Sequence, residues 1–298
     1  MIGLGCNAFG ERIDGATSAR VVHAALDAGI TLFDTADGYG GGASEEMLGA
    51  ALKGRRDEAV IATKFSLPTG PRPHNRGASR GHILTAVNGS LRRLGVDHVD
   101  LYQQHVPDAN TPIEETLSAL DDAVRAGKIR YIGSSNFPAW QLAEAEWAAR
   151  AIGTERFVSV QNNYSLVIRD VEREVVPLCQ RYGLGLIPCF PLASGLLTGK
   201  YKRGAPIPPG SKMSVPWSSR MFLSDRNFDV VEGLAKFAAE RGASLLQLAI
   251  GALAAQPFVS SVIAGASRPE QVLANVEAGN WVPTPEDLEE INRLAPGI

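Results

Sequence analysis

The sequence predicts an α/β fold in which eight strands, each followed by a helix, close a (β/α)8 TIM barrel. Short apolar runs alternate with amphipathic helical segments along the whole chain, a pattern that predicts parallel strands. Eight such runs can be counted, the number that closes a barrel. An open doubly wound sheet is the alternative, but Gly3, Gly5 and Gly10 lack the G-x-G-x-x-G spacing of its phosphate turn.

Length and composition favour a single cytoplasmic enzyme. The 298 residues fit one barrel, and without an internal linker we expect one domain over residues 1–298. A net charge of −3 gives no indication of a nucleic-acid or membrane partner. Cys6, Cys179 and Cys189 are widely spaced, which argues against a disulfide framework or a metal site. No apolar run reaches membrane-spanning length, and no signal region begins the chain.

Each element has a local reason. Apolar runs bounded by polar or glycine residues predict strands at 1–6, 30–34, 60–64, 99–105, 129–133, 158–161, 185–189 and 259–264. Apolar residues at helical spacing predict helices at 17–28, 44–52, 83–94, 113–126, 140–152, 172–182, 230–241, 244–255, 269–278 and 285–294. Gly29, Gly95 and Gly127 end three of them, and Ser44 is the expected N-cap of the second. The helices at 230–241 and 285–294 are therefore extra, one before the last strand and one at the C-terminus.

One long connection departs from this regular alternation. Residues 193–223 form a segment rich in Gly, Pro, Ser and Lys, longer than a simple connector. A loop of this length in a compact fold is usually functional or mobile.

Four chemically active side chains follow successive strands. Asp34 ends the second strand, Tyr39 lies in the loop after it, and Lys64 and His105 end the third and fourth. Singly, each has a structural explanation, such as turn capping, a snorkelling lysine or a satisfied core histidine. Jointly they point to one site, because the carboxyl ends of barrel strands meet at the same face.

Neutral polar residues follow the fifth and sixth strands. Ser135, Asn136 and Gln161 are donors and acceptors that suit the amide of a nicotinamide ring, although they could instead cap turns.

Later loops carry features that suit phosphate. Gly195 and Gly199 let backbone N–H groups approach a phosphate closely. Arg268 stands where a helix begins, so a second phosphate there would meet a guanidinium and a helix N-terminus. Gln271 and Asn275 share a face of that helix and could reach an adenine edge.

The order of the four active residues, together with the words around them, resembles the aldo-keto reductases from Gly3 to about Asn275. The matching words are Phe33-Asp34-Thr35-Ala36, Ala62-Thr63-Lys64 and Asp100-Leu101-Tyr102 running to His105. The resemblance implies a barrel that binds NADPH without a Rossmann fold and reduces an aldehyde or ketone. It implies that Tyr39 is the general acid, that Lys64 lowers its pKa, that Asp34 holds Lys64, and that His105 orients the carbonyl.

The strand ends and the resemblance together give a set of expected cofactor contacts. They are Gly5, Cys6, Asn7, Asp34, Ser135, Asn136, Gln161, Phe190, Pro191, Leu192, Ser194, Gly195, Leu197, Gly199, Lys200, Gly265, Ser267, Arg268, Gln271 and Asn275. The family places the group that meets the adenosine 2′-phosphate at Arg268, which implies a preference for NADPH. The alternative is that Arg268 merely pairs with Glu270.

Two features depart from the family pattern. Many members have an aromatic residue two places before Pro191, stacked on the nicotinamide, where this chain has Cys189; Phe190 or Tyr164 would have to stack, or polar contacts alone would hold the ring. Relatives also usually carry a hairpin before the first strand, which we expect to be missing here because the chain begins almost on that strand. We therefore expect Ile2 and Leu4 to be partly exposed at the lower mouth, unless another segment such as the C-terminal helix covers it.

Other functions fit the fold less well. The same fold with an intact tetrad also serves as a nicotinamide-sensing regulatory subunit of potassium channels, with little turnover, but no long extra N-terminal segment supports that partner here. A lyase or isomerase for sugar phosphates would not need Ser135, Asn136 and Gln161. The physiological carbonyl and the oligomeric state stay open, because the substrate walls lie on the variable loops near Asn75, Pro107 and Trp217.

Overall fold

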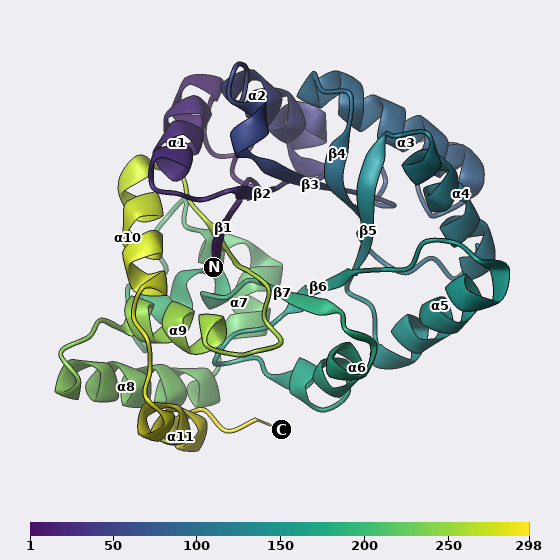
Figure 1. Cartoon of the computed structure of the whole chain (residues 1–298). Helices are drawn as coiled ribbons and strands as arrows, with labels where there is room; N and C mark the ends of the chain where they lie inside the picture. Colours follow the sequence, from purple (N-terminus) through teal and green to yellow (C-terminus); the bar gives the residue numbers. More distant parts are fainter. Residues whose placement is uncertain (298) are drawn as a thin grey trace.

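Eight parallel strands form a ring with helices around it in the computed structural model, which describes residues 1–297 (Figure 1). The strands are β1 (Ile2–Gly5), β2 (Leu32–Asp34), β3 (Val60–Phe65), β4 (Val99–Gln104), β5 (Ile129–Ser135), β6 (Ser159–Asn163), β7 (Gly185–Cys189) and β8 (Val262–Gly265). They pair in the order β7-β6-β5-β4-β3-β2-β1-β8, with β1 between β8 and β2. The predicted barrel is confirmed.

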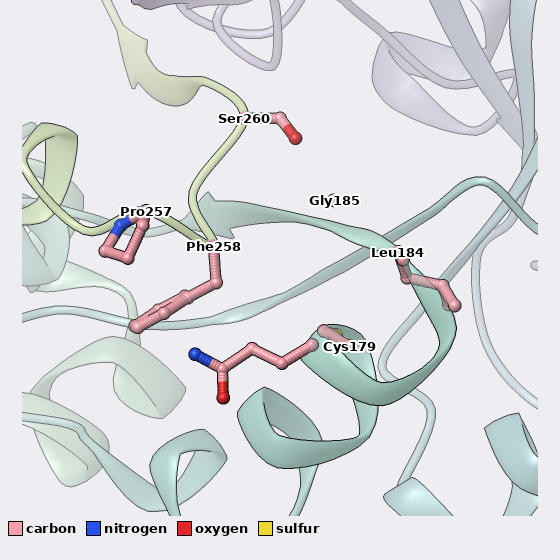
Figure 2. Close-up of a pocket in the computed structure, with 8 residues that line it drawn as sticks. Cys179, Leu184, Gly185, Pro257, Phe258 and Ser260 are labelled. Atoms are coloured by element: carbon pink, nitrogen blue, oxygen red, sulfur yellow. The ribbon is translucent and has the colours of Figure 1, made fainter.

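The ring closes between β7 and the segment that leads into β8. Leu186 N–H donates to the Phe258 carbonyl at 2.9 Å, and Ser260 N–H donates to the Leu186 carbonyl at 2.9 Å. A pocket of about 370 Å³ lies beside this seam, and Figure 2 shows Phe258 and Ser260 on one side of it and Cys179 and Leu184 on the other. Gly185 permits the approach, because a Cβ there would collide with the Ser260 hydroxyl. The barrel is therefore nearly closed, with a thin seam.

The helices lie outside the ring. They are α1 (Gly15–Asp27), α2 (Ala43–Ala51), α3 (Arg80–Leu94), α4 (Ile113–Arg125), α5 (Ala139–Ile152), α6 (Val175–Tyr182), α7 (Pro216–Phe222), α8 (Asp225–Glu240), α9 (Leu245–Ala254), α10 (Pro269–Gly279) and α11 (Pro285–Leu294). Capping follows sequence chemistry: Ser244 and Gln247 form a capping box on α9, and Gly95 ends α3 in the left-handed conformation. The expected extra helices before β8 and at the C-terminus are present, as α8 and α11.

Some boundaries differ from the sequence prediction. The helix expected from residue 172 begins at Val175, after a 3₁₀ turn. The connection at 193–223 contains the 3₁₀ turn Ala193–Thr198 and helix α7. Ser44 is not an N-cap: it lies inside α2, and its hydroxyl pairs with Thr35 Oγ1 at 2.8 Å and donates to the Cys6 carbonyl at 2.9 Å.

The expectation of an exposed lower mouth is wrong. Ile2 and Leu4 are 9% and 1% exposed. Ile2 packs against the end of α10, where a Cβ on Gly279 would come within 2.5 Å of Ile2 Cγ1. The C-terminal helix does not provide the cover, since α11 lies beside α8 at the periphery (Figure 1). None of the helices within residues 1–297 combines the length and apolar character needed to span a membrane.

Candidate active site

The structure brings the four predicted active residues together at the carboxyl ends of β2, β3 and β4. Lys64 Nζ donates to Asp34 Oδ2 at 2.6 Å and to the Thr35 carbonyl at 2.9 Å. The same nitrogen lies 5.2 Å from the centroid of the Tyr39 ring. The Tyr39 and His105 rings meet edge to face with centroids 5.8 Å apart. Tyr39, expected in a loop, is the first residue of the 3₁₀ turn Tyr39–Gly42.

Burial sets the protonation states of these groups. Burial disfavours charge on Lys64, but the charge and hydrogen bond of Asp34, together with the nearby Tyr39, outweigh it, so the pKa of Lys64 is raised. Burial raises the pKa of Tyr39 by more than the Lys64 charge lowers it, so the expected net lowering is not found. Burial, followed by the Lys64 charge, lowers the pKa of His105 to about 3. At neutral pH the site therefore holds a charged lysine, a protonated tyrosine and a neutral imidazole.

Two glutamines hold the second oxygen of Asp34. Gln161 Nε2 donates to Asp34 Oδ1 at 2.8 Å, and Gln103 Nε2 donates to it at 3.2 Å. Gln161 was expected to face a nicotinamide amide, but its amide nitrogen is committed to Asp34, which leaves its carbonyl oxygen for a ligand. Gln103 was missed by sequence reasoning. The sequence does contain a sign of its position. Residues two apart along a strand point to the same face, and Gln103 precedes His105 by two residues.

Asn136 joins the loop after β4, which carries His105, to the end of β5, which carries Ser135. Its side-chain nitrogen donates to the His105 carbonyl at 2.9 Å and to Ser135 Oγ at 3.0 Å. Asn136 adopts a left-handed φ of 60°, a conformation that asparagine tolerates better than most residues. A pocket of about 380 Å³ opens beside it between the loops after β5 and β6. The expected amide-binding residues thus adjoin the four active residues.

The loop after β7 is a tight turn with several left-handed residues. Phe190, Ala193 and Ser194 have φ values of 54°, 47° and 56°, and Gly195 follows with 93°. Successive backbone N–H groups in such conformations can form concave anion sites, but Ala193 N–H and Gly195 N–H already donate to the Phe190 and Leu192 carbonyls at 2.8 Å, so an anion here would depend on the other donors of the turn. Within the part of the chain that the structure describes, the buried Ser194 hydroxyl has no hydrogen-bond partner. Lys200 lies over this turn, since a Cβ on Gly195 would be 2.9 Å from its Nζ.

Lys212 is a second residue that sequence reasoning missed. Its Nζ lies 4.8 Å from the centroid of the Phe190 ring. Burial, followed by the nearby charge of Arg12, lowers the pKa of Lys212 to about 8. Nothing in the sequence marked it within the Lys-containing stretch at 193–223, because only the folded course of that stretch brings it to Phe190.

Phe190 and Tyr164, the two rings expected to stack on a nicotinamide, are both held by other contacts. Phe190 packs edge-on against Trp217, with centroids 5.4 Å apart. Tyr164 is buried and its hydroxyl donates to Glu172 Oε1 at 2.7 Å, so its polar end is already occupied. Burial raises the pKa of Cys189 to about 12, which keeps this thiol neutral.

The ends of β1 and β8 gather further predicted contacts. Arg268 is the exposed N-cap residue of α10, and among the described ion pairs none joins it to Glu270. Gln271 Oε1 accepts from Ser267 N at 2.8 Å and from Ser267 Oγ at 3.1 Å, so this oxygen closes the turn instead of facing outward. Asn7 Oδ1 is buried and has no partner among residues 1–297, and a Cβ on the neighbouring Gly265 would lie 3.5 Å from it.

The remaining expected contacts differ in access. Cys6 and Leu197 are fully buried, and their N–H groups already donate to the Asp34 and Leu192 carbonyls, so neither residue is free for a ligand. Pro191 is buried as well. Leu192 and Gly199 are half-buried, and Asn275 is buried. Gly5 pairs with Gly265 in the ladder between β1 and β8.

A parallel barrel with a buried lysine–aspartate pair, a tyrosine and a neutral histidine at its carboxyl face defines an NAD(P)H-dependent barrel oxidoreductase. The family model described as "Aldo/keto reductase family" matches residues 1–296. The chain belongs to the aldo/keto reductase family.

Relatives carry two kinds of name. A "Probable voltage-gated potassium channel subunit beta" from Oryza sativa subsp. japonica is 39% identical, over 96% of this chain and 89% of the relative. An "L-glyceraldehyde 3-phosphate reductase" from Escherichia coli (strain K12) is 37% identical, over 87% and 78%. "Aldo-keto reductase YhdN" from Bacillus subtilis (strain 168) is 36% identical, over 98% and 89%.

Proposed function

We propose that this chain, as one barrel domain over residues 1–298, reduces a small aldehyde or ketone to an alcohol with NADPH. The observation that carries the proposal is the fully buried Lys64, held by Asp34 at 2.6 Å and lying beside Tyr39. Family membership and the reductase names of relatives support it. Three free thiols suit the reducing cytoplasm, where we place the reaction.

The residues present offer contacts for the amide and for the phosphates of NADPH, which carries a diphosphate and a 2′-phosphate. Bound NADPH supplies the hydride that reduces the carbonyl carbon. Ser135, Asn136 and the free oxygen of Gln161 suit its amide. The left-handed turn at Ser194–Gly195, with its unpartnered hydroxyl, suits a phosphate. Other residues that we assign to the cofactor are Gly5, Asn7, Phe190, Pro191, Leu192, Gly199, Lys200, Lys212, Gly265, Ser267, Arg268, Gln271 and Asn275.

The four active residues divide the proton chemistry. Tyr39 is protonated at neutral pH and donates its proton to the oxygen that gains charge during reduction. Lys64 places a positive charge beside the tyrosinate that results, and Asp34 fixes that charge in place. His105 is neutral and orients the carbonyl oxygen by hydrogen bonding.

Steady-state oxidation of NADPH with a panel of aldehydes and ketones tests the proposal. Tyr39→Phe should lower kcat by about 10²- to 10⁴-fold, because a general acid is typically worth that much. The dissociation constant for NADPH should be unchanged, since the fold and phosphate contacts are intact. A Tyr39→Phe variant with more than a tenth of the wild-type rate would remove Tyr39 from the mechanism.

A second candidate is a nicotinamide-sensing channel subunit, which the names of relatives at 39% and 38% identity favour. Such a protein would bind NADPH tightly and turn over slowly. A single-turnover experiment followed by a steady-state assay separates the two functions. Rapid oxidation of bound NADPH by an aldehyde, together with repeated turnover in the steady state, supports the enzyme. Tight binding with turnover too slow to detect with every carbonyl supports the subunit.

A further inference from the structure

The turn that carries Tyr39 has little stiffness of its own. Gly40, Gly41 and Gly42 follow it with φ values of 58°, 64° and 101°. Glycine reaches these values without steric cost, but it also has the widest freedom to leave them. Three long hydrogen bonds tie the backbone of the turn: Tyr39 N–H to the Ala36 carbonyl and Gly41 N–H to the Gly38 carbonyl, both at 3.2 Å, and Gly40 N–H to Glu11 Oε1 at 3.3 Å. The position of Tyr39 therefore depends on what the turn packs against.

The turn packs against the side chain of Arg93 from α3. A Cβ on Gly42 would lie 2.8 Å from Arg93 Cδ and 3.1 Å from its Nε, so only glycine allows this approach. Arg93 is held by Glu45 of α2, with Nε and Nη2 each 2.7 Å from Glu45 Oε2. Glu45 is fully buried, whereas the Arg93 side chain is 29% exposed.

Glu45 also contacts the strand that carries Lys64. Thr63 Oγ1 donates to Glu45 Oε1 at 2.5 Å, and Thr63 directly precedes Lys64 on β3. The neighbouring residue Ser44 pairs with Thr35 Oγ1 at 2.8 Å, and the Thr35 carbonyl accepts from Lys64 Nζ. One set of contacts thus runs from the lysine strand through Glu45 and Arg93 to the tyrosine turn.

We propose that Glu45 and Arg93 are positioning residues that set the Tyr39 ring against the Lys64 ammonium. The inference rests on the proposed function and adds to it a support behind the site. A buried ion pair is often no more stabilising than apolar residues of similar size. A carboxylate and a guanidinium, however, bind in a fixed planar geometry, which is what alignment of two elements requires.

Arg93→Met tests the proposal because it keeps most of the apolar stem and removes the guanidinium. We expect kcat to fall by about 10- to 100-fold, since a small misplacement of reacting groups has effects of this size. The dissociation constant for NADPH and the KM for the carbonyl should stay within about twofold. Arg93→Lys should restore part of the rate, and the isosteric Glu45→Gln should lower it. Arg92→Met is the matched control, because Arg92 is the exposed neighbour on the same helix.

Ultraviolet titration of Tyr39 gives a readout without turnover. The signal is the difference between chains with Tyr39 and with Tyr39→Phe, recorded with Arg93 and with Arg93→Met. Tyr39 faces Lys64, Asp34, Cys189 and His105, and Lys64 and Asp34 act on its pKa in opposite directions. Displacement from Lys64 should raise the tyrosine pKa in Arg93→Met.

Two results would overturn the proposal: an unchanged tyrosine titration, or a loss of rate that merely follows the loss of folded protein in thermal unfolding. If wild type turns over no carbonyl, the proposed function fails, while the titration still decides the positioning role.

Discussion

Removing the Asp34 carboxylate should strongly destabilise the barrel. In Asp34→Asn the fully buried Lys64 ammonium loses the negative charge that lies 2.6 Å away, and the single amide oxygen of asparagine cannot face both Lys64 and the two glutamines. Breaking a buried pair by removing one partner typically costs about 3–5 kcal/mol, because an uncompensated charge remains. Gln103 and Gln161 also lose a charged acceptor. We expect the free energy of unfolding of Asp34→Asn to be lower than that of wild type by about 3–5 kcal/mol.

The effect has a defined pH dependence. The pKa of Lys64 is raised in the folded state, so the contribution of the pair is fully present below the ordinary lysine value of 10.5. It is lost as pH rises through the higher folded value. The difference between wild type and Asp34→Asn should therefore narrow as pH rises above about 10.5.

Urea unfolding followed by tryptophan fluorescence measures this difference. The control is the double variant Asp34→Asn/Lys64→Met, in which no charge is left behind. If the pair acts as described, the double variant should be clearly more stable than the sum of the two single losses predicts. Simple additivity would refute the reasoning, since it would mean that the ammonium and the carboxylate do not depend on each other.

Three more variants test single residues. Arg268→Ala should weaken NADPH binding by about 10- to 100-fold, because it removes a charged hydrogen bond worth about 1.5–3 kcal/mol. NADH binding should be almost unchanged in fluorescence titrations, and equal weakening of both cofactors would exclude a contact between Arg268 and the 2′-phosphate. Burial, followed by the charge of Glu45, raises the pKa of Asp37 to about 7, so the stability of wild type should fall as pH rises from about 4 to 7. In urea unfolding, Asp37→Asn should be more stable than wild type between about pH 5 and 8, and equal stability there would contradict the raised pKa. Lys212 has a pKa near 8, so NADPH affinity should decline as pH rises through 8 in wild type but not in Lys212→Met, and parallel profiles would argue against a cofactor role.

The sequence was enough to predict which elements meet at the site. Barrel geometry places every strand end on one face, so the positions of Asp34, Lys64 and His105 along the chain already implied their convergence. Glycine chemistry likewise located helix ends such as Gly95.

Partner choice inside the site was beyond the sequence. Gln161 has two hydrogen-bonding ends, and only the arrangement of neighbouring strands shows that its nitrogen turns to Asp34. Ser44 has the chemistry of an N-cap but is the second residue of α2, where its hydroxyl bonds with Thr35 and the Cys6 carbonyl instead. The cover over Ile2 came from α10, a helix almost the whole chain away. Each of these outcomes depends on contacts between distant segments, which local patterns do not encode.

The seam beside Leu186 is a place where the ring of strands has few backbone hydrogen bonds to separate. Most neighbouring strands share regular ladders, whereas β7 meets the lead-in to β8 through the two hydrogen bonds at Leu186. The loops on either side of this junction are those that we assign to the phosphates of the cofactor. Widening of the junction would part those two loops and leave β2, β3 and β4 in register. The strands that align the tyrosine and the lysine therefore do not depend on this junction, which lies on the other side of the ring.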